Sequence, residues 1–468
     1  MRPRNQSPRD QLAAVLRRRS AASASDLAAQ LGISVPTLHR LLQEQGDTVI
    51  KTGKARRTRY ALRRPLRGDL AELPLYAVDA AGQANRVAHL ALVHPQGSCM
   101  DIAGTVWPVP EESRDGWWDG LPYPLTDMRP QGYLGRQLAR AEHRAFGVSA
   151  NPEEWSDDDV AHVLSRIGSD TSGNLILGNA ALERWQAHQF SPPESMTAIK
   201  PRALGRAYAR LAERAVATGV PGSSAAGEFP KFTALRELAR ADTPHVLVKF
   251  SGADGSAAVQ RWADLLVCEH LALECATTLP NETSAASARS RILVQDGRTF
   301  LEVERFDRHG HFGRSPLLSL GTLDAALLGA GTADWTRLAT RLHAAGLLGG
   351  DSVQRIHQLW WFGRLVANSD MHTGNLSFTT QADTRMLALA PAYDMLPMFY
   401  APLPGGEVPL RHFEPALPLP PQRALWTAAC SVAVDFWLRA AEDSRISAGF
   451  RGLCRANADK LQRLIDRV

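Results

Sequence analysis

The sequence predicts a mixed α+β protein built from several domains. Its 468 residues correspond to about three domains of average size. Hydrophobic residues make up 44% of the chain and charged residues 22%, and 36 Gly and 29 Pro are spread along it, which is typical of a globular protein. Segments with helical spacing of apolar residues alternate with short β-prone runs, so both kinds of element are expected.

The cysteines and the apolar segments exclude several classes of protein. The five cysteines form no C-x-x-C pair, so neither a disulfide framework nor a zinc site is predicted. The first ten residues lack the apolar core of a signal peptide, and the most apolar run, residues 316–331, contains Asp324 and is too short to span a bilayer. We therefore expect a cytoplasmic protein without membrane association.

Residues 10–64 have the pattern of a winged helix-turn-helix. Ser23, with Asp26 three residues later, is suited to cap a second helix that ends at Gly32, and Ser34 is suited to cap a third. Val49 and Ile50, and then residues 59–61, predict two short strands joined by a basic turn. The second and third helices would be the DNA-reading pair.

Positive charge is concentrated in this head. Residues 1–70 carry a net charge of +10, and the rest of the chain carries −5. A basic head suggests contact with a polyanion, although helix-turn-helix units also serve in dimerisation and docking, and basic runs are often only solvated. The candidate DNA-binding residues are Thr37, His39 and Arg40 on the third helix and Lys51, Lys54, Arg56 and Arg57 on the hairpin.

Residues 65–200 show no pattern that points to chemistry. We expect a strand over 83–93 and helices over 133–146 and from Asp157 onward, the last capped by Ser156. The acidic residues Asp157 to Asp159 complement the positive end of the helix dipole and need no metal. A further helix over 202–218 leads into the part of the chain with chemical motifs.

Two motifs suit phosphate binding. The loop of small residues from Pro221 to Leu235 allows backbone N–H groups to approach an anion, although such loops are usually linkers. The apolar strand over 245–252 contains one lysine, Lys249. A lysine in such a strand is either solvated at a sheet edge or paired, because an isolated buried ammonium group is costly.

The next two segments complete a nucleotide-binding pattern. The helix over 261–275 offers Glu269 and Glu274 as partners for Lys249, and its spacing does not decide between them. Cys268 and Cys275 share one helical face and are interpreted as core residues. Extended backbone from Glu304 to Phe306, in the strand over 300–308, is suited to hydrogen-bond an adenine edge.

The strongest motif is Asp370, followed by Asn375 and, nineteen residues later, Asp394. Phosphoryl transfer needs a carboxylate that accepts the proton of the attacking hydroxyl, and a carboxamide and a second carboxylate to hold Mg²⁺. Each residue alone has a structural alternative in turns or on the surface. The order of loop, lysine, helix, hinge and this motif favours kinase chemistry. His372 has no second histidine at ligand spacing, so we interpret it as a bracing residue.

These segments resemble the HipA-type serine/threonine kinases of bacterial toxin–antitoxin systems. The resemblance covers about residues 70–468 and, with the helix-turn-helix head, is greatest to the YjjJ branch. The motifs that carry it are SSAAGEFPKFTAL, VERFDR, NSDMHTGN, AYDMLP and, upstream, DDDVAHVLSRIGSDTSGNL.

The resemblance implies a two-lobed kinase fold like those of protein and lipid kinases. It implies ATP and Mg²⁺ as cofactors, with Asp370 as catalytic base and Asn375 and Asp394 as metal ligands. Lys249 would bind phosphate, Glu304 to Phe306 would form the adenine hinge, and Ser224 matches the serine whose autophosphorylation inactivates such kinases. The remaining cofactor-binding residues that it implies are Ala225, Ala226, Gly227 and Lys231.

The predicted domains are 1–68 (winged helix-turn-helix), 69–200 (HipA-type N-terminal subdomain), 201–310 (kinase N-lobe) and 311–468 (helical C-lobe). The prototype loop reads AGAQEK, whereas this chain has AGEFPK at residues 226–231, so its phosphate-facing geometry is open. The prototype also binds DNA through a separate antitoxin, whereas here a head is fused to the kinase, as a DNA anchor, an autoinhibitor or both. A separate antitoxin and a homodimer stay open.

The leading functional hypothesis is a growth-inhibiting protein kinase toxin. Family members with known targets modify aminoacyl-tRNA synthetases, so a protein substrate in translation is implied. A small-molecule phosphotransferase shares the Asp, Asn, Asp layout and is one alternative. A nucleotide-sensing transcription regulator without transfer activity is the other, although the intact Lys249, Asp370, Asn375 and Asp394 argue against it.

Overall fold

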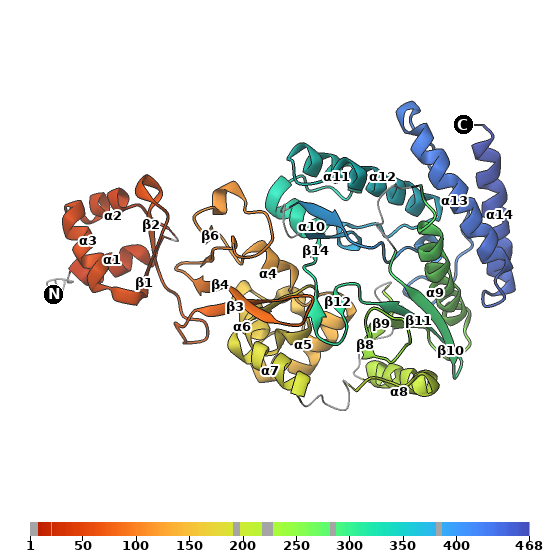
Figure 1. Ribbon diagram of the computed structural model, residues 1–468, viewed down its shortest axis with the longest axis horizontal. Helices are drawn as coiled ribbons and strands as arrows, with labels where there is room; N and C mark the ends of the chain where they lie inside the picture. Colours follow the sequence, from red (N-terminus) through yellow and green to blue (C-terminus); the bar gives the residue numbers. More distant parts are fainter. Residues whose placement is uncertain are drawn as a thin grey trace. The chain divides into compact units, whose positions relative to one another are not determined.

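The computed structural model divides into two compact units (Figure 1). Unit 1 comprises Met1–Asp79, Gln83–Arg129 and Glu154–Ala187, and unit 2 comprises Ala80–Gly82, Pro130–Glu153 and His188–Val468. The structure describes residues 8–19, 21–190, 197–217, 228–280, 287–380 and 386–467. The four domain boundaries expected from the sequence stay a prediction.

Unit 1 begins with the three helices and the hairpin that the sequence predicts. These are α1 (Pro8–Leu16), α2 (Ala24–Leu31), α3 (Val35–Glu44), β1 (Val49–Thr52) and β2 (Arg59–Leu62). Ser23 and Ser34 cap α2 and α3, and Gly32 ends α2 in the left-handed conformation. Leu12, Leu27 and Leu38 meet in one buried cluster. The local signals of the sequence are therefore confirmed in this part of the chain.

The rest of unit 1 is built on a five-stranded antiparallel sheet in the order β6-β5-β4-β3-β7. Its strands are β3 (Leu73–Val78), β4 (Ala84–Leu92), β5 (Ser98–Cys99), β6 (Trp117–Trp118) and β7 (Leu175–Leu177). The helices are α4 (Tyr123–Asp127), α6 (Asp157–Ile167) and α7 (Asn179–Phe190). Ser156 caps α6 as predicted.

Arginines pair with the acidic residues at the start of α6. Asp158 binds Arg64, and Asp159 binds Arg67 at 2.5 Å. Arg129 binds Asp157 at 2.8 Å. These carboxylates serve helix capping and ion pairs, and the described residues contain no group of three or more His, Cys, Asp or Glu suited to hold a metal ion.

Unit 2 contains a four-stranded antiparallel sheet in the order β10-β11-β9-β8. The strands are β8 (Lys231–Leu235), β9 (His245–Phe250), β10 (Ser290–Gln295) and β11 (Arg298–Glu304). One face of this sheet packs on α8 (Leu204–Ala217) through Tyr208, Val248 and Phe300. Lys249 points from the opposite face, because side chains alternate along a strand.

The remainder of unit 2 is mainly helical. Its helices are α5 (Gly132–Phe146), α9 (Ala257–Ala276), α10 (Leu320–Leu323), α11 (Trp335–Ala344), α12 (Gly350–Leu365), α13 (Arg423–Glu442) and α14 (Ala448–Ile465). Its short strands are β12 (Arg308–His309), β13 (Gly313–Arg314), β14 (Leu318–Ser319), β15 (Ser377–Thr380) and β16 (Leu387–Leu389). Helix α13 packs against α9, α12 and α14 (Figure 1). No helix in the described ranges is long and apolar enough to cross a bilayer.

Helix α9 is fixed to the helical part of unit 2 at two points. Near its middle, Asp264 accepts hydrogen bonds from the Ser447 N–H at 2.7 Å and the Ser447 Oγ at 2.6 Å. At its end, the buried Arg355 of α12 donates to the carbonyl oxygen of Ala276 at 2.8 Å. The glutamates of α9 are therefore held in a defined position relative to α12 and to the start of α14.

Candidate active site

Lys249 lies on β9, an inner strand, and its side chain is only 6% exposed. Its Nζ is 2.8 Å from both carboxylate oxygens of Glu269 and 2.6 Å from Asp394 Oδ1. The alternative of a solvated lysine on a sheet edge is therefore wrong, because neighbouring strands cover both edges of β9. Glu269 is the helical partner that the sequence left undecided, whereas Glu274 pairs with Arg439.

Lys249, Glu269 and Asp394 shift one another's pKa values. Burial raises the pKa of Glu269 to about 7, although Lys249 opposes the change. Burial lowers the pKa of Lys249, but the carboxylates of Asp394 and Glu269 raise it above its ordinary value overall. For Asp394 burial favours the neutral form, yet the Lys249 ammonium holds its pKa below the usual range. Asp394 and Lys249 are thus charged at neutral pH.

The segment after α12 places Asp370 and Asn375 beside Asp394. Asn375 is buried, and its Nδ2 donates to the Asp370 carbonyl oxygen at 2.8 Å. A third residue, Asn368, was not among those predicted from the sequence. Its Oδ1 accepts a hydrogen bond from the Asp370 N–H at 3.0 Å, and its Nδ2 donates one to the Asp394 carbonyl oxygen at 3.3 Å. One buried carboxamide therefore joins the two carboxylate-bearing segments.

Backbone strain occurs in these two segments. Ala367 (φ +58°) and Asp394 (φ +56°) are left-handed although neither is glycine. The Phe399 N–H binds the Ala367 carbonyl oxygen at 3.0 Å, and Asn368 holds that of Asp394. Strained backbone that neighbouring groups hold in place is frequent at functional sites.

His372 braces the loop, as predicted. Its Nδ1 accepts from the Gly374 N–H at 3.1 Å, and its carbonyl oxygen accepts from Trp335 Nε1 at 3.2 Å. On the far side, the Tyr393 hydroxyl donates to the Gly374 carbonyl oxygen at 2.7 Å. These contacts fix the turn between Asp370 and Asn375.

The predicted phosphate loop is described only at its C-terminal end. Ser224, Ala225, Ala226 and Gly227 lie outside the described residues. Lys231 is described, and its Nζ is 2.8 Å from Glu228 Oε1. Glu228 also accepts from the Tyr133 N–H and from Arg136 of α5. Burial opposes ionisation of Glu228, but Lys231 and these donors lower its pKa overall.

In the predicted hinge, Glu304 to Phe306, two of the three backbone N–H groups already donate hydrogen bonds within the protein. The Glu304 N–H donates to the Arg289 carbonyl oxygen at 2.8 Å, and the Arg305 N–H donates to that of His245 at 3.0 Å. The Phe306 N–H has no backbone acceptor within the described ranges. The Phe306 ring lies 5.7 Å from that of Tyr393, which precedes Asp394. An adenine edge would thus find its N–H donor at Phe306.

The donor set fits a magnesium ion. Asn375 donates through Nδ2 to the Asp370 carbonyl oxygen, so its amide oxygen is available as a metal ligand. Asp394 accepts from Lys249 through Oδ1, so its Oδ2 is available as well. Mg²⁺ prefers a few oxygen ligands from protein and keeps waters and substrate phosphates as the others. A lysine, two acidic side chains and a carboxamide are the groups that phosphoryl transfer requires.

Comparison with known proteins decides the family. Residues 223–452 match the model of the HipA-like C-terminal domain, and residues 69–186 match that of the YjjJ-like toxin middle domain. The chain is 37% identical to toxin YjjJ of Escherichia coli K12 over 447 residues, which are 95% of this chain and 96% of that protein. The chain belongs to the YjjJ-like branch of the HipA family. The family resemblance inferred from the motifs is confirmed, and a HipA-like kinase domain implies use of ATP.

Two solved structures are similar at low sequence identity. One is HipA of Shewanella oneidensis MR-1 in a complex with HipB and operator DNA, which is 16% identical and covers 84% of this chain and 97% of that one, with a TM-score of 0.48. The other is the Helicobacter pylori proinflammatory kinase CtkA, which is 10% identical and covers 51% of this chain and 89% of that one, with a TM-score of 0.33.

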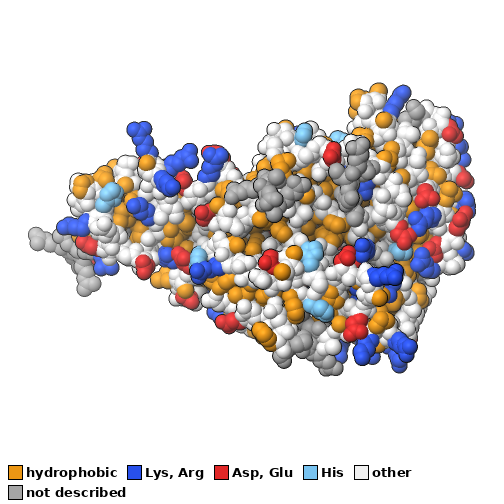
Figure 2. Space-filling model, in the orientation of Figure 1, with side chains coloured by type: hydrophobic (Ala, Val, Ile, Leu, Met, Phe, Trp, Pro, Cys, Tyr) orange, Lys and Arg blue, Asp and Glu red, His pale blue; other side chains and the backbone are white. Residues whose placement is uncertain are grey.

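The candidate DNA-binding residues lie on the surface of the head. Lys51, Lys54, Arg56 and Arg57 are exposed, and none of the carboxylates in the described ranges pairs with them. Lys and Arg side chains project over the β1–β2 hairpin (Figure 2). On α3, His39 and Arg40 are exposed, whereas the Thr37 hydroxyl lies 2.9 Å from that of the cap Ser34. Thr37 is therefore partly committed to helix capping.

Proposed function

We propose that the protein is an ATP- and Mg²⁺-dependent serine/threonine protein kinase that inhibits growth. The contact of Lys249 with both Glu269 and Asp394 carries the proposal, since it joins strand β9, helix α9 and the segment of Asp394 in one cluster, as a kinase site requires. Lys249 orients the ATP phosphates, and Asn375 and Asp394 hold the metal. A magnesium ion held there would supply positive charge to the transferred phosphoryl group.

The remaining roles follow from the positions of the side chains. Asp370 accepts the proton of a serine or threonine hydroxyl as its oxygen bonds to the γ-phosphorus and the bond from phosphorus to the ADP oxygen breaks. The exposure of Asp370 supports this role, because a protein hydroxyl has to reach it. By family resemblance, Ser224 is the autophosphorylation site and aminoacyl-tRNA synthetases are the first substrates to examine.

Transfer of labelled γ-phosphate tests this proposal. Purified protein with Mg·ATP and a bacterial extract should label itself and at least one extract protein. Asp370→Asn should reduce the rate of labelling by about a hundredfold to ten-thousandfold, because loss of a general base typically costs 10²–10⁴ in rate. Asp459→Asn, on an exposed position of α14, is the matched control and should retain full transfer. Equal labelling by wild type and Asp370→Asn would contradict the assignment.

We further propose that residues 8–64 are a winged helix-turn-helix that binds DNA. Support comes from the capped α3 with exposed His39 and Arg40, and from the unpaired basic hairpin. Helix α3 would enter the major groove while the hairpin contacts phosphates. His39→Ala and Arg40→Ala should narrow the affinity gap between a selected operator and random DNA, each by about 1–3 kcal/mol. An unchanged gap in fluorescence anisotropy titrations would contradict base reading by α3.

A further inference from the structure

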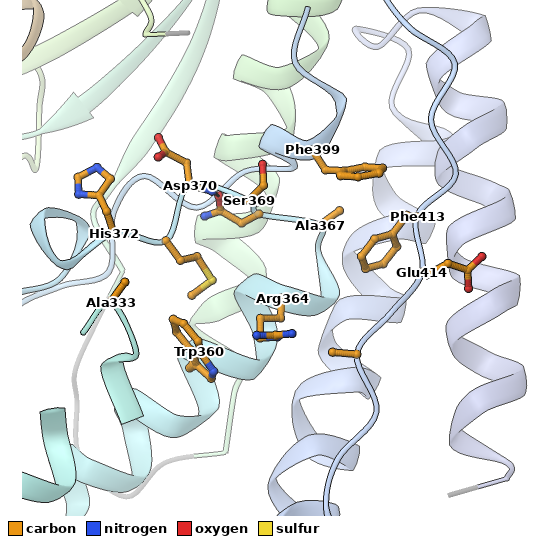
Figure 3. A pocket seen from close by; sticks show the side chains of 13 residues that line it. Ala333, Trp360, Arg364, Ala367, Ser369, Asp370, His372, Phe399, Phe413 and Glu414 are labelled. Atoms are coloured by element: carbon orange, nitrogen blue, oxygen red, sulfur yellow. Dashed lines mark hydrogen bonds between the residues drawn. The ribbon is translucent and has the colours of Figure 1, made fainter. Parts of the chain in front are cut away.

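A pocket of about 450 Å³ lies beside Asp370 (Figure 3). One wall comes from α12 with Trp360 and Arg364, and another from the extended segment after Tyr400 with Phe413. The figure shows Asp370 on one side of the pocket and Arg364 on another, between Trp360 and Phe413. Because Asp370 is the proposed base, this pocket receives the residues that flank the acceptor hydroxyl.

Arg364 gives the pocket an uncompensated positive charge. Its guanidinium lies over the Trp360 ring, 5.8 Å from the centroid, and Arg364 is exposed. No carboxylate in the described part of the chain pairs with it. Two carboxylates line the pocket, Asp370 and Glu414, and Glu414 is already paired with Lys460 at 2.7 Å. An incoming carboxylate would therefore find its free partner in Arg364.

The rest of the surroundings are apolar and extended. The Phe399 and Phe413 rings are 6.2 Å apart and both line the pocket. The same segment exposes three leucines, Leu410 at 79%, Leu417 at 60% and Leu419 at 67%. Exposed apolar side chains on a segment that also lines a pocket suit contact with another polypeptide. They suit a polypeptide better than a small hydroxylated molecule, which would fill the pocket alone.

We propose that this pocket selects protein segments with Asp or Glu within a few residues of the phosphorylated serine or threonine. Arg364 binds that carboxylate, and Phe399 and Phe413 bind an apolar neighbour. The planar guanidinium is suited to two parallel hydrogen bonds with a carboxylate. This inference rests on the proposed kinase function and names its substrate class.

Matched serine peptides test the inference. A peptide set that carries Asp or Glu at positions around the serine is compared with the same set carrying Asn or Gln, under Mg·ATP. For the wild type, we expect KM for the best acidic peptide to be about tenfold lower than for its amide counterpart, as one charge-assisted hydrogen bond provides. Arg364→Ala should remove this difference, and Arg364→Glu should transfer the preference to peptides with Lys or Arg.

The control is Arg463→Ala. Arg463 also lies exposed in the last turn of a helix, α14, but does not line the pocket, so its removal should leave both KM values unchanged. KM for ATP should stay the same in all variants, which separates acceptor binding from misfolding. Wild-type transfer without acidic preference, or an unchanged preference in Arg364→Ala, overturns this inference alone. Absence of wild-type transfer to any extract protein overturns the kinase proposal as well.

Discussion

The basic hairpin of the head and the charged cluster around Lys249 use lysine and arginine in opposite ways. Lys54, Arg56 and Arg57 are exposed and have no carboxylate partner within the described ranges. Lys249 is buried and contacts two carboxylates at 2.8 Å or less. In the first arrangement no carboxylate of the described residues fixes the position of the charge, whereas in the second two carboxylates hold it in one place.

This difference determines how each region responds to substitution. Exposed charges act almost independently and are screened by salt, so their contributions are small and nearly additive. Buried charges depend on one another, because removal of one leaves its partner charged in a poorly solvated place. Substitutions should therefore have large, non-additive effects near Lys249 and small, additive effects in the hairpin.

The largest effect is expected for Lys249→Met. This substitution leaves Glu269 and Asp394 facing each other without a cation, so we expect a loss of about 3–5 kcal/mol in the free energy of unfolding. Transfer should fall at least a hundredfold, since the phosphates lose a positioned charge. Urea denaturation and the labelled-phosphate assay measure the two losses.

The double variant Lys249→Met/Glu269→Gln separates the two effects. Removal of the second charge should restore most of the stability, because a neutral amide tolerates burial beside methionine better than a carboxylate does. It should restore no transfer. Additive losses of stability in the double variant would show that the three charges are not coupled.

A smaller effect is expected for Asn368→Ala. This substitution removes both of its hydrogen bonds, to the Asp370 N–H and to the Asp394 carbonyl oxygen. Misplacement of reacting groups by about 1 Å can cost a hundredfold in rate, so kcat should fall by about ten- to a hundredfold. KM for ATP should change little, because Lys249 stays in place.

Asn368→Asp is the matched control for this position. It keeps the acceptor for the Asp370 N–H and loses the donor to Asp394, so an intermediate kcat is expected. If Asn368→Ala transfers phosphate at the wild-type rate, the bridge between the two segments has no catalytic importance.

The sequence predicted best what local interactions decide. The caps Ser23, Ser34 and Ser156 were predictable because each side chain binds a backbone N–H three residues later. The choice between Glu269 and Glu274 was not, since it depends on how α9 rotates against β9. Contacts of α9 with Ser447 and Arg355, far away in the sequence, fix that rotation.

The overlooked residues have the same explanation. One of the two hydrogen bonds of Asn368 had a local signal, because an asparagine side chain can accept a hydrogen bond from the backbone N–H two residues later, here that of Asp370. Its second bond, to the Asp394 carbonyl, joins residues 26 positions apart and has no local signal. Arg364 is a basic residue in the last turn of α12, a common position for a cation, and only the pocket beside Asp370 distinguishes it.

The smallest effects are expected for Arg56→Ala and Arg57→Ala in the hairpin. Each should weaken DNA binding only a few-fold, equally for operator and random DNA, and lower the slope of log K against log salt by about 0.9 for each phosphate that is no longer neutralised. Arg67→Ala is the matched control, because Arg67 is already paired with Asp159 at 2.5 Å and its removal should leave the slope unchanged. If Arg67→Ala lowers the slope of log K against log salt as much as Arg56→Ala does, then DNA binding by the head does not depend on whether an arginine lacks a carboxylate partner. In that case ion pairing would matter for the function of the buried cluster around Lys249 but not for DNA binding by the head.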